Sequence, residues 1–252
     1  MNRRLSRAYA LASLQLLLAG MVSAGGVLHA QGYVFRWGAA NANHEQIITY
    51  ATLNTGYSVP GGKSILSPDN CGSMKAFSSI TGQSPGITPD IAAKQLREAF
   101  ATWEAVAAVR FVPVEDAALA DIIVGATSQP SGRAFTNLSY RAGQDADPIG
   151  KALGKSEQPA VVSHTGQSDT VAEIEQAYVC LNPAQGWKVG FDGNLQIYDL
   201  KYTFTHEIGH AIGLDHPGKT GAIMAYRYDE NTSILSPSDI AAVQSIYGPK
   251  RN

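Results

Sequence analysis

The sequence lacks a strong excess of charge of either sign. Its 252 residues include 19 lysines and arginines against 21 aspartates and glutamates, a formal net charge of −2 at pH 7. A near-neutral chain has no electrostatic basis for binding nucleic acid or an anionic membrane, so we expect neither partner. Internal repeats and low-complexity segments are also missing, which argues against a repeat architecture.

Long apolar runs are absent except at the N-terminus. There the basic segment "MNRRLSR" precedes the apolar stretch "AYALASLQLLLAGMV", and small residues follow. This order is typical of a secretory signal peptide, and the apolar run is too short for a membrane anchor. We therefore predict a signal peptide at residues 1–30, cut after Ala24 or, preferably, after Ala30. Residues 31–252 would then form a single-domain, monomeric protein, secreted to the periplasm or the extracellular space.

Cysteine is scarce, since the chain contains only Cys71 and Cys180. An even number of cysteines in an exported protein favours a disulfide, because compartments outside the cytoplasm are oxidising. We expect a bridge between Cys71 and Cys180. Two free, buried thiols are the alternative.

Hydrophobic periodicity predicts a mixed α+β fold. Apolar positions in residues 88–107 repeat at helical spacing, with Thr88 as the N-cap and Pro89 at the first helical position. A last helix begins after Ser236, and Gly248 lies just past its end. Strand patterns occur at residues 45–53, 109–114, 120–126 and 171–182, and a loop rich in glycine, proline and serine at residues 56–73.

Histidine is scarce too, yet three of the six histidines lie close together in "THEIGHAIGLDHPG". Residues four apart on a helix share a face, so His206 and His210 point the same way. Gly213 can end that helix in a left-handed turn and bring His216 back toward them. Three imidazole nitrogens with a fourth position left open are the ligand set of a catalytic zinc.

Glu207 and Met224 complete a pattern that resembles the metzincin metalloproteases. The pattern is His-Glu-x-x-His-x-x-Gly-x-x-His followed by a methionine turn. The resemblance extends further, because residues 101–114, 120–126 and 235–248 are similar to the first helix, a core strand and the last helix of matrixin catalytic domains.

The resemblance implies the zincin fold of the metzincins. A twisted mixed sheet with two backing helices would occupy residues 31–216, and a small C-terminal subdomain would occupy residues 217–252. The zinc cleft would lie between them, with Met224 as a soft apolar floor under the imidazoles. An extended peptide could bind along the exposed edge of the sheet by adding a strand.

For function, the resemblance implies a secreted zinc-dependent endopeptidase that acts on proteins or peptides. Zinc lowers the pKa of its water toward ~7, and Glu207 would take that proton as general base and hand it to the leaving amine. Two alternatives are a catalytically inactive metzincin that serves as a binding module and a zinc hydrolase for other substrates. The presence of Glu207 argues against the binding module.

Two tyrosines near the methionine turn resemble different branches of the metzincins. Pro217, Gly218 and the spacing of Met224 from Tyr226 are similar to serralysins, and in serralysins and astacins that tyrosine reaches the zinc. Tyr228 falls where matrixins place a tyrosine that walls the main specificity pocket. The resemblance implies a catalytic role for Tyr226 in the first case and a substrate-pocket role for Tyr228 in the second.

Other features of matrixins have weaker counterparts in this chain. Asp121 matches a calcium-binding position, so calcium is a further candidate ligand. Matrixins bind a second, structural zinc through histidines, but residues 128–183 contain only His164, so we expect that site to be lost. We expect His164 and His44 at the surface. A propeptide cysteine caps the zinc in matrixins; Cys71 shares its following glycine but lacks its flanking residues.

Overall fold

The computed structural model describes residues 29–30, 33–38, 44–60, 70–129, 131–141, 161–164, 167–218 and 220–251. Apart from its last two residues, the predicted signal peptide lies outside this part of the chain. The α-helices described are α1 (Pro89–Glu104), α3 (Leu200–Ala211) and α4 (Pro237–Tyr247), with 3-10 helices at Phe77–Thr81 and Ala117–Leu119. No helix within the described ranges is long and apolar enough to cross a membrane.

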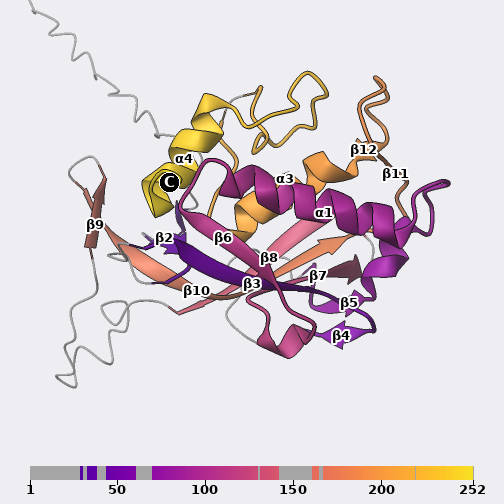
Figure 1. The fold of residues 1–252 in the computed structure, drawn as a ribbon, viewed down its shortest axis with the longest axis horizontal. Helices are drawn as coiled ribbons and strands as arrows, with labels where there is room; N and C mark the ends of the chain where they lie inside the picture. Colours follow the sequence, from indigo (N-terminus) through magenta and orange to yellow (C-terminus); the bar gives the residue numbers. More distant parts are fainter. Residues whose placement is uncertain are drawn as a thin grey trace, which may run out of the picture.

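The described strands form one ten-stranded mixed sheet and a separate pair (Figure 1). The sheet contains β1 (His29–Ala30), β2 (Tyr33–Arg36), β3 (Gln46–Thr52), β4 (Tyr57–Ser58), β5 (Ser73–Lys75), β6 (Val109–Pro113), β7 (Ile122–Thr127), β8 (Ala134–Arg141), β9 (Val161–His164) and β10 (Gln167–Leu181). The pair is β11 (Trp187–Lys188) with β12 (Tyr198–Asp199).

The centre of the sheet is parallel. β3 lies between β6 and β7, and β7 continues the sheet to β10, which also pairs with β2. All six residues of β7 are buried, as expected for a central parallel strand covered on both faces. The four strands predicted from the sequence are therefore confirmed as β3, β6, β7 and β10, whereas β4 and β5 fall in and beside the segment predicted as loop.

One antiparallel strand, β8, was not predicted and forms an edge of the sheet. It pairs with β10 from Arg141 opposite Glu173 to Ala134 opposite Leu181. Within the described part of the chain, β8 pairs with no other strand, so its outer edge is open. An open edge can accept a further strand, because its backbone N–H and C=O groups are unpaired.

Helices α1 and α3 lie side by side across one face of the sheet (Figure 1). The start of α1 is as predicted, because Thr88 Oγ1 accepts a hydrogen bond from Ile91 N at 3.3 Å and Pro89 follows it. Trp103 of α1 is fully buried, and its Nε1 donates to Thr205 O of α3 at 2.9 Å. This contact fixes the helix that carries two of the clustered histidines.

A disulfide joins Cys71 to Cys180, with 5.7 Å between the Cα atoms. It links the chain just before β5 to β10 in the middle of the sheet, and both residues are fully buried. The predicted bridge is confirmed. Both alternatives, free thiols and a Cys71 that caps the metal, are thereby excluded.

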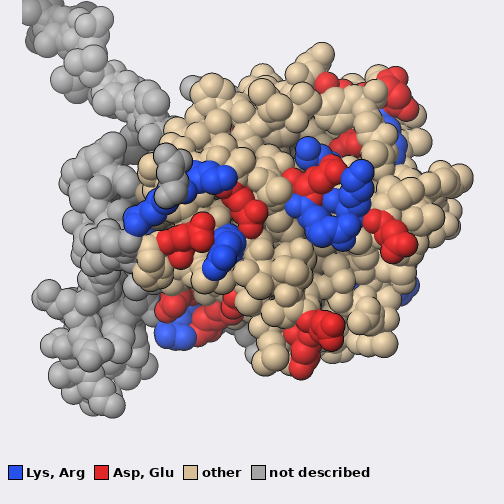
Figure 2. Space-filling view, viewed as in Figure 1, with Lys and Arg blue, Asp and Glu red and all other residues tan. Residues whose placement is uncertain are grey.

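Charged residues are mixed on the surface. On the face drawn in Figure 2, Lys and Arg side chains alternate with Asp and Glu in small groups, and no large area has a single sign. This distribution agrees with the near-zero net charge of the sequence.

Candidate metal centre and active-site cleft

Helix α3 presents the first two histidines. Asp199 begins the helix, because its Oδ1 accepts a hydrogen bond from Tyr202 N at 2.7 Å. One turn separates His206 from His210, and their ring centroids are 4.7 Å apart. The predicted shared helix face is therefore present.

The third histidine is returned to this face by a left-handed turn at Gly213. Its φ is +93°, a conformation that favours glycine, and a Cβ there would overlap the carbonyl of Phe35 in β2. His216 Nε2 then lies 3.2 Å from His206 Nε2, which lies 3.1 Å from His210 Nε2. Glycine is thus required at 213 both by the turn and by the strand that packs against it.

These separations fit a single tetrahedral zinc. Two nitrogens at roughly 2.0–2.1 Å from one ion, at tetrahedral angles, are about 3.3–3.4 Å apart. The measured Nε2 separations are 3.1 and 3.2 Å. Among the described residues, no other group of three or more His, Cys, Asp or Glu side chains comes close enough together to hold a metal.

Hydrogen bonds to the backbone orient the two helical histidines. His206 Nδ1 lies 2.7 Å from Ile223 O, and His210 Nδ1 lies 2.8 Å from Leu214 O. A carbonyl only accepts, so each Nδ1 carries the proton and each Nε2 offers its lone pair. Burial lowers the pKa of His206 to about 4 and also lowers the pKa of His210 and His216. All three rings are therefore neutral near pH 7, as metal ligands must be.

The methionine turn forms the floor of this group. Met224 is 1% exposed, and a Cβ placed on Gly209 would overlap its sulfur, so the side chain packs directly beneath α3. The turn is held by Asp239 at the start of α4, whose carboxylate accepts from Ile223 N at 2.9 Å and from Met224 N at 3.2 Å. Because Ile223 O in turn orients His206, the last helix stabilises the ligand geometry.

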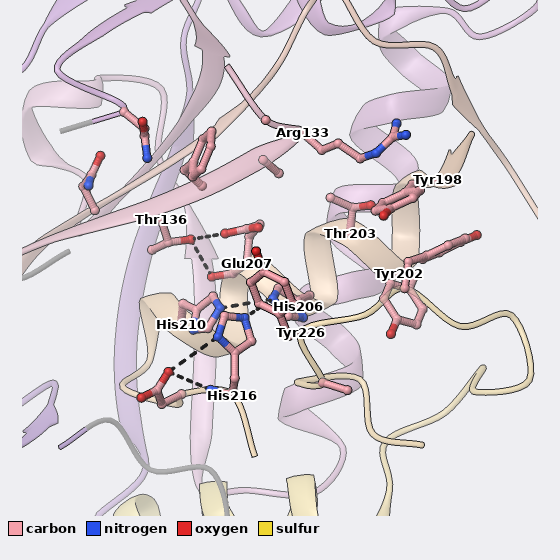
Figure 3. Close-up of a pocket in the computed structure, with 18 residues that line it drawn as sticks. Arg133, Thr136, Tyr198, Tyr202, Thr203, His206, Glu207, His210, His216 and Tyr226 are labelled. Atoms are coloured by element: carbon pink, nitrogen blue, oxygen red, sulfur yellow. Dashed lines mark hydrogen bonds and ion pairs between the residues drawn. The ribbon is translucent and has the colours of Figure 1, made fainter. Parts of the chain in front are cut away.

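Glu207 lies beside the histidines and is almost fully buried at 6% exposure. Thr136 Oγ1, from the edge strand β8, lies 2.8 Å from Glu207 Oε2 and 2.9 Å from Glu207 O (Figure 3). Burial raises the pKa of Glu207 to about 7, although the hydrogen bond from Thr136 acts in the opposite direction. Such a carboxyl group can both accept and donate a proton near neutral pH.

The histidines and Glu207 open into a cleft of about 640 Å³. Residues Gly132–Asn137, at and just before the start of the edge strand β8, line one side, and the start of α3 with the preceding β12 lines another. Residues 225–228 after the methionine turn complete it. Asn70 and residues 132–137 thus reach the cleft from segments distant in sequence from the histidine motif.

The sequence profile of the matrixin peptidases matches residues 76–248. The chain belongs to the matrixin family. Its relatives include metalloendoproteinase 4-MMP of Arabidopsis thaliana, 30% identical over 172 residues, which cover 67% of this chain and 43% of the relative. Interstitial collagenase of Sus scrofa is 26% identical over 180 residues, 69% of this chain and 32% of the collagenase. The chain therefore spans less than half the length of these relatives.

Membership of the matrixins confirms the α+β metzincin fold and implies zinc for the histidine triad. The structure brings together the predicted ligands and Glu207, with Met224 below them. Tyr226 also lies at this matrixin's cleft: it is 84% exposed, and its ring centroid is 5.3 Å from that of His216. Its hydroxyl makes no hydrogen bond to the described residues.

Tyr228 lies in a wall of aromatic side chains. Its ring stacks on Tyr198 at 4.1 Å and contacts Tyr202 edge-on at 4.8 Å. Its hydroxyl accepts from Asp199 N at 3.0 Å and donates to Glu230 Oε1 at 2.9 Å. The position agrees with a pocket wall, and the hydrogen bonds fix the ring rather than leaving the hydroxyl for substrate.

Among the cleft residues that the sequence did not indicate, Thr136 and Arg133 have the most direct contacts. Thr136 contacts Glu207, and Arg133 lies on the same edge at the far end of the cleft from the histidines (Figure 3). Neither belongs to a sequence motif, and the strand that carries Thr136 was not predicted. A strand prediction at residues 134–141 would have been needed to find them.

The remaining predicted positions lie outside the cleft. Asp121 Oδ2 accepts from Thr49 N at 2.7 Å and from Thr49 Oγ1 at 2.9 Å, so its carboxylate joins β3 to the start of β7. His44 is exposed, as expected. His164 ends β9, and its side chain lies outside what the structure describes.

Proposed function

We propose that this matrixin is an exported, zinc-dependent endopeptidase whose mature form comprises residues 31–252. The observation that carries the proposal is the convergence of three neutral histidines and a buried glutamate beside an open strand edge. The N-terminal subdomain, residues 31–216, and the C-terminal subdomain, residues 217–252, would enclose the cleft. The disulfide and the apolar N-terminus support export.

The proposed metal ligands are the Nε2 atoms of His206, His210 and His216. When bound, zinc supplies the Lewis acidity that polarises the scissile carbonyl and acidifies the attacking water. Glu207 takes the proton from that water. Thr136 holds Glu207 Oε2, whereas Oε1 makes no hydrogen bond within the described part of the chain and is left for the proton. The same carboxyl group then donates the proton to the leaving nitrogen.

The proposed substrate is an extended peptide paired with the open edge of β8. An added strand forms backbone hydrogen bonds that do not depend on its sequence, so specificity comes from the side-chain pockets. Tyr228 is proposed to wall one of these pockets. The hydroxyl of Tyr226, which the fold leaves exposed beside His216, is proposed to donate a hydrogen bond to the oxyanion of the reacting carbonyl.

The proposal is tested on the purified mature protein with casein and with internally quenched peptides. We expect hydrolysis that a chelator abolishes and that added zinc restores. If zinc-loaded protein binds peptides but cuts none, it is a binding module. If it hydrolyses other zinc-hydrolase substrates and spares peptides, the substrate class is wrong.

A further inference from the structure

Among the described residues that line the cleft, Arg133 is the only lysine or arginine. It precedes β8, and its guanidinium carbon lies 4.1 Å from the centroid of the Tyr198 ring. Its Nη1 donates to Gln185 Oε1 at 3.1 Å. Stacking and one hydrogen bond therefore hold a flat cation in place at the end of the cleft opposite the histidines (Figure 3).

The support beneath this cation is rigid. Tyr198 stacks on Tyr228 with 4.1 Å between centroids and 14° between planes, so the guanidinium caps a stack of two rings. The hydroxyl of Tyr228 is fixed by Asp199 N and by Glu230. Because these contacts already hold the guanidinium in one orientation, it loses little conformational entropy when it binds a ligand.

The cation has no carboxylate partner among the described residues. Other arginines of the sheet do: Arg110 pairs with Glu45 at 3.3 Å, and Arg141 pairs with Glu175 at 2.9 Å. A guanidinium has five N–H donors arranged in a fork, and Gln185 uses one of them. The remaining donors suit a carboxylate, which a fork can bind through two parallel hydrogen bonds.

Strand geometry gives the distance between this cation and the reacting bond. Thr136, three residues after Arg133 and near the start of β8, contacts Glu207. Arg133 lies in the bend just before β8, so at no more than about 3.3 Å per residue it is at most about 10 Å from that point. A peptide extended along the open edge would therefore place a residue about three positions from the cut bond beside the guanidinium.

We propose that Arg133 is a specificity-determining residue that binds a carboxylate of the substrate about three residues from the cut bond. The carboxylate is either an Asp or Glu side chain or the C-terminal carboxylate of a short peptide. The inference rests on the proposed peptidase function and adds the chemical class of residue that this end of the cleft selects.

The test uses pairs of quenched peptides that differ only by Glu or Gln at one position, scanned over four positions on each side of the cut bond. For the wild-type protein we expect kcat/KM to favour Glu about three- to tenfold at one position near the third. The preference should shrink in 1 M salt, because this cation is partly exposed and screened. A further pair of peptides ends at that position, one with a free C-terminal carboxylate and one with an amide. Faster cleavage of the free form would show that Arg133 binds a terminal carboxylate rather than a side-chain one.

The variant Arg133→Gln should abolish the Glu preference, and Arg133→Lys should keep part of it, because lysine retains the charge but not the fork. Arg110→Gln, which removes a surface cation on β6, is the matched control and should keep the whole preference. The inference is overturned if no position favours Glu, or if Arg133→Gln keeps the preference. If Arg133→Gln fails to fold, the wild-type Glu/Gln ratio and its salt dependence decide.

A failure of the proposed function has a different signature. In that case zinc-loaded wild-type protein cuts none of the peptides. Binding of the same fluorescent Glu and Gln peptides, measured by anisotropy, then decides on Arg133 independently of turnover. Tighter binding of the Glu peptide by wild-type protein but not by Arg133→Gln supports the inference, and equal binding refutes it.

Discussion

The two sides of the cleft are built in opposite ways. The metal-binding side comes from one stretch of sequence, residues 206–226, in which a helix, a glycine turn and the methionine turn with Tyr226 follow one another. The substrate side combines the edge strand β8, the segment that ends in β12, and Tyr228 with its partner Glu230. Its parts meet only through contacts between segments that are distant in sequence.

This difference predicts how each side responds to substitution. Backbone carbonyls within the segment orient both helical histidines, so the ligand geometry depends little on the rest of the cleft. The aromatic wall depends on long-range partners such as Glu230. Changes on the metal side should therefore lower kcat, and changes on the substrate side should mainly raise KM.

The largest effect should follow from Glu207→Gln on the metal side. The amide cannot take the proton, whereas the three histidines remain, so kcat should fall by about 10³–10⁴ while the protein still binds zinc. Steady-state kinetics and metal analysis of the same sample check this. Glu98→Gln, an exposed change on α1, is the control. Near-normal turnover by Glu207→Gln would refute the mechanism.

A smaller loss should follow from Tyr226→Phe, which removes one hydroxyl and keeps the ring. If that hydroxyl donates to the oxyanion, kcat should fall by about 10² with little change in KM. The ring contact with His216 is preserved, so zinc content should not change. An unchanged kcat would assign Tyr226 a packing role and leave Tyr228 as the functional tyrosine of this segment.

Thr136→Val should break the simple division between the two sides. Thr136 belongs to the substrate side, yet its hydroxyl lies 2.8 Å from Glu207 Oε2. Loss of this one hydrogen bond should lower kcat about tenfold, since the carboxylate that moves the proton loses its fixed orientation. Thr136→Ser keeps the hydroxyl and should restore kcat. A rise in KM alone would place Thr136 with the substrate wall instead.

The metal side could be predicted from the sequence because its geometry is local. His206 and His210 share a face by helical period, and Gly213 signals the turn that returns His216. The same holds for the strands with apolar patterns and for α1, whose start is marked by Thr88. The disulfide followed from the count of two cysteines and the expected compartment.

The edge strand on the substrate side could not be predicted, because β8 lacks the alternation of apolar and polar residues that is typical of a strand. Its buried positions include Thr136 and Asn137, whose polar groups bind Glu207 and the Cys71 N–H instead of packing in an apolar core. Apolar alternation is therefore missing where the strand contacts the active site. β2 was also not predicted, because it is only four residues long. Its Phe35 carbonyl leaves no room for a side chain at position 213, but this contact joins segments that are distant in sequence.

The smallest effect should follow from Glu230→Gln, which weakens the hydrogen bonds that hold the aromatic wall around Tyr228 in place. Glu230 is the partner of Lys188, and its Oε2 accepts from Gly193 N at 2.6 Å and from Asp192 N at 3.0 Å. A glutamine side chain has only one acceptor oxygen, whereas the two carboxylate oxygens of Glu230 accept from the Tyr228 hydroxyl and from the two backbone N–H groups. It either loses the bond from Tyr228 or turns its NH₂ group toward the backbone N–H groups.

In both orientations the segment around Gly193 is released from the wall that carries Tyr228. KM should rise about two- to fivefold, and kcat should stay within a factor of about two, because Glu230 contacts none of the three histidines or Glu207 and is only a weak determinant of binding. Glu45→Gln removes a paired surface glutamate at the other end of the sheet and should change neither value. If Glu230→Gln lowered kcat as much as Thr136→Val, the wall would be coupled to the metal side. The independence of the two sides would then be wrong.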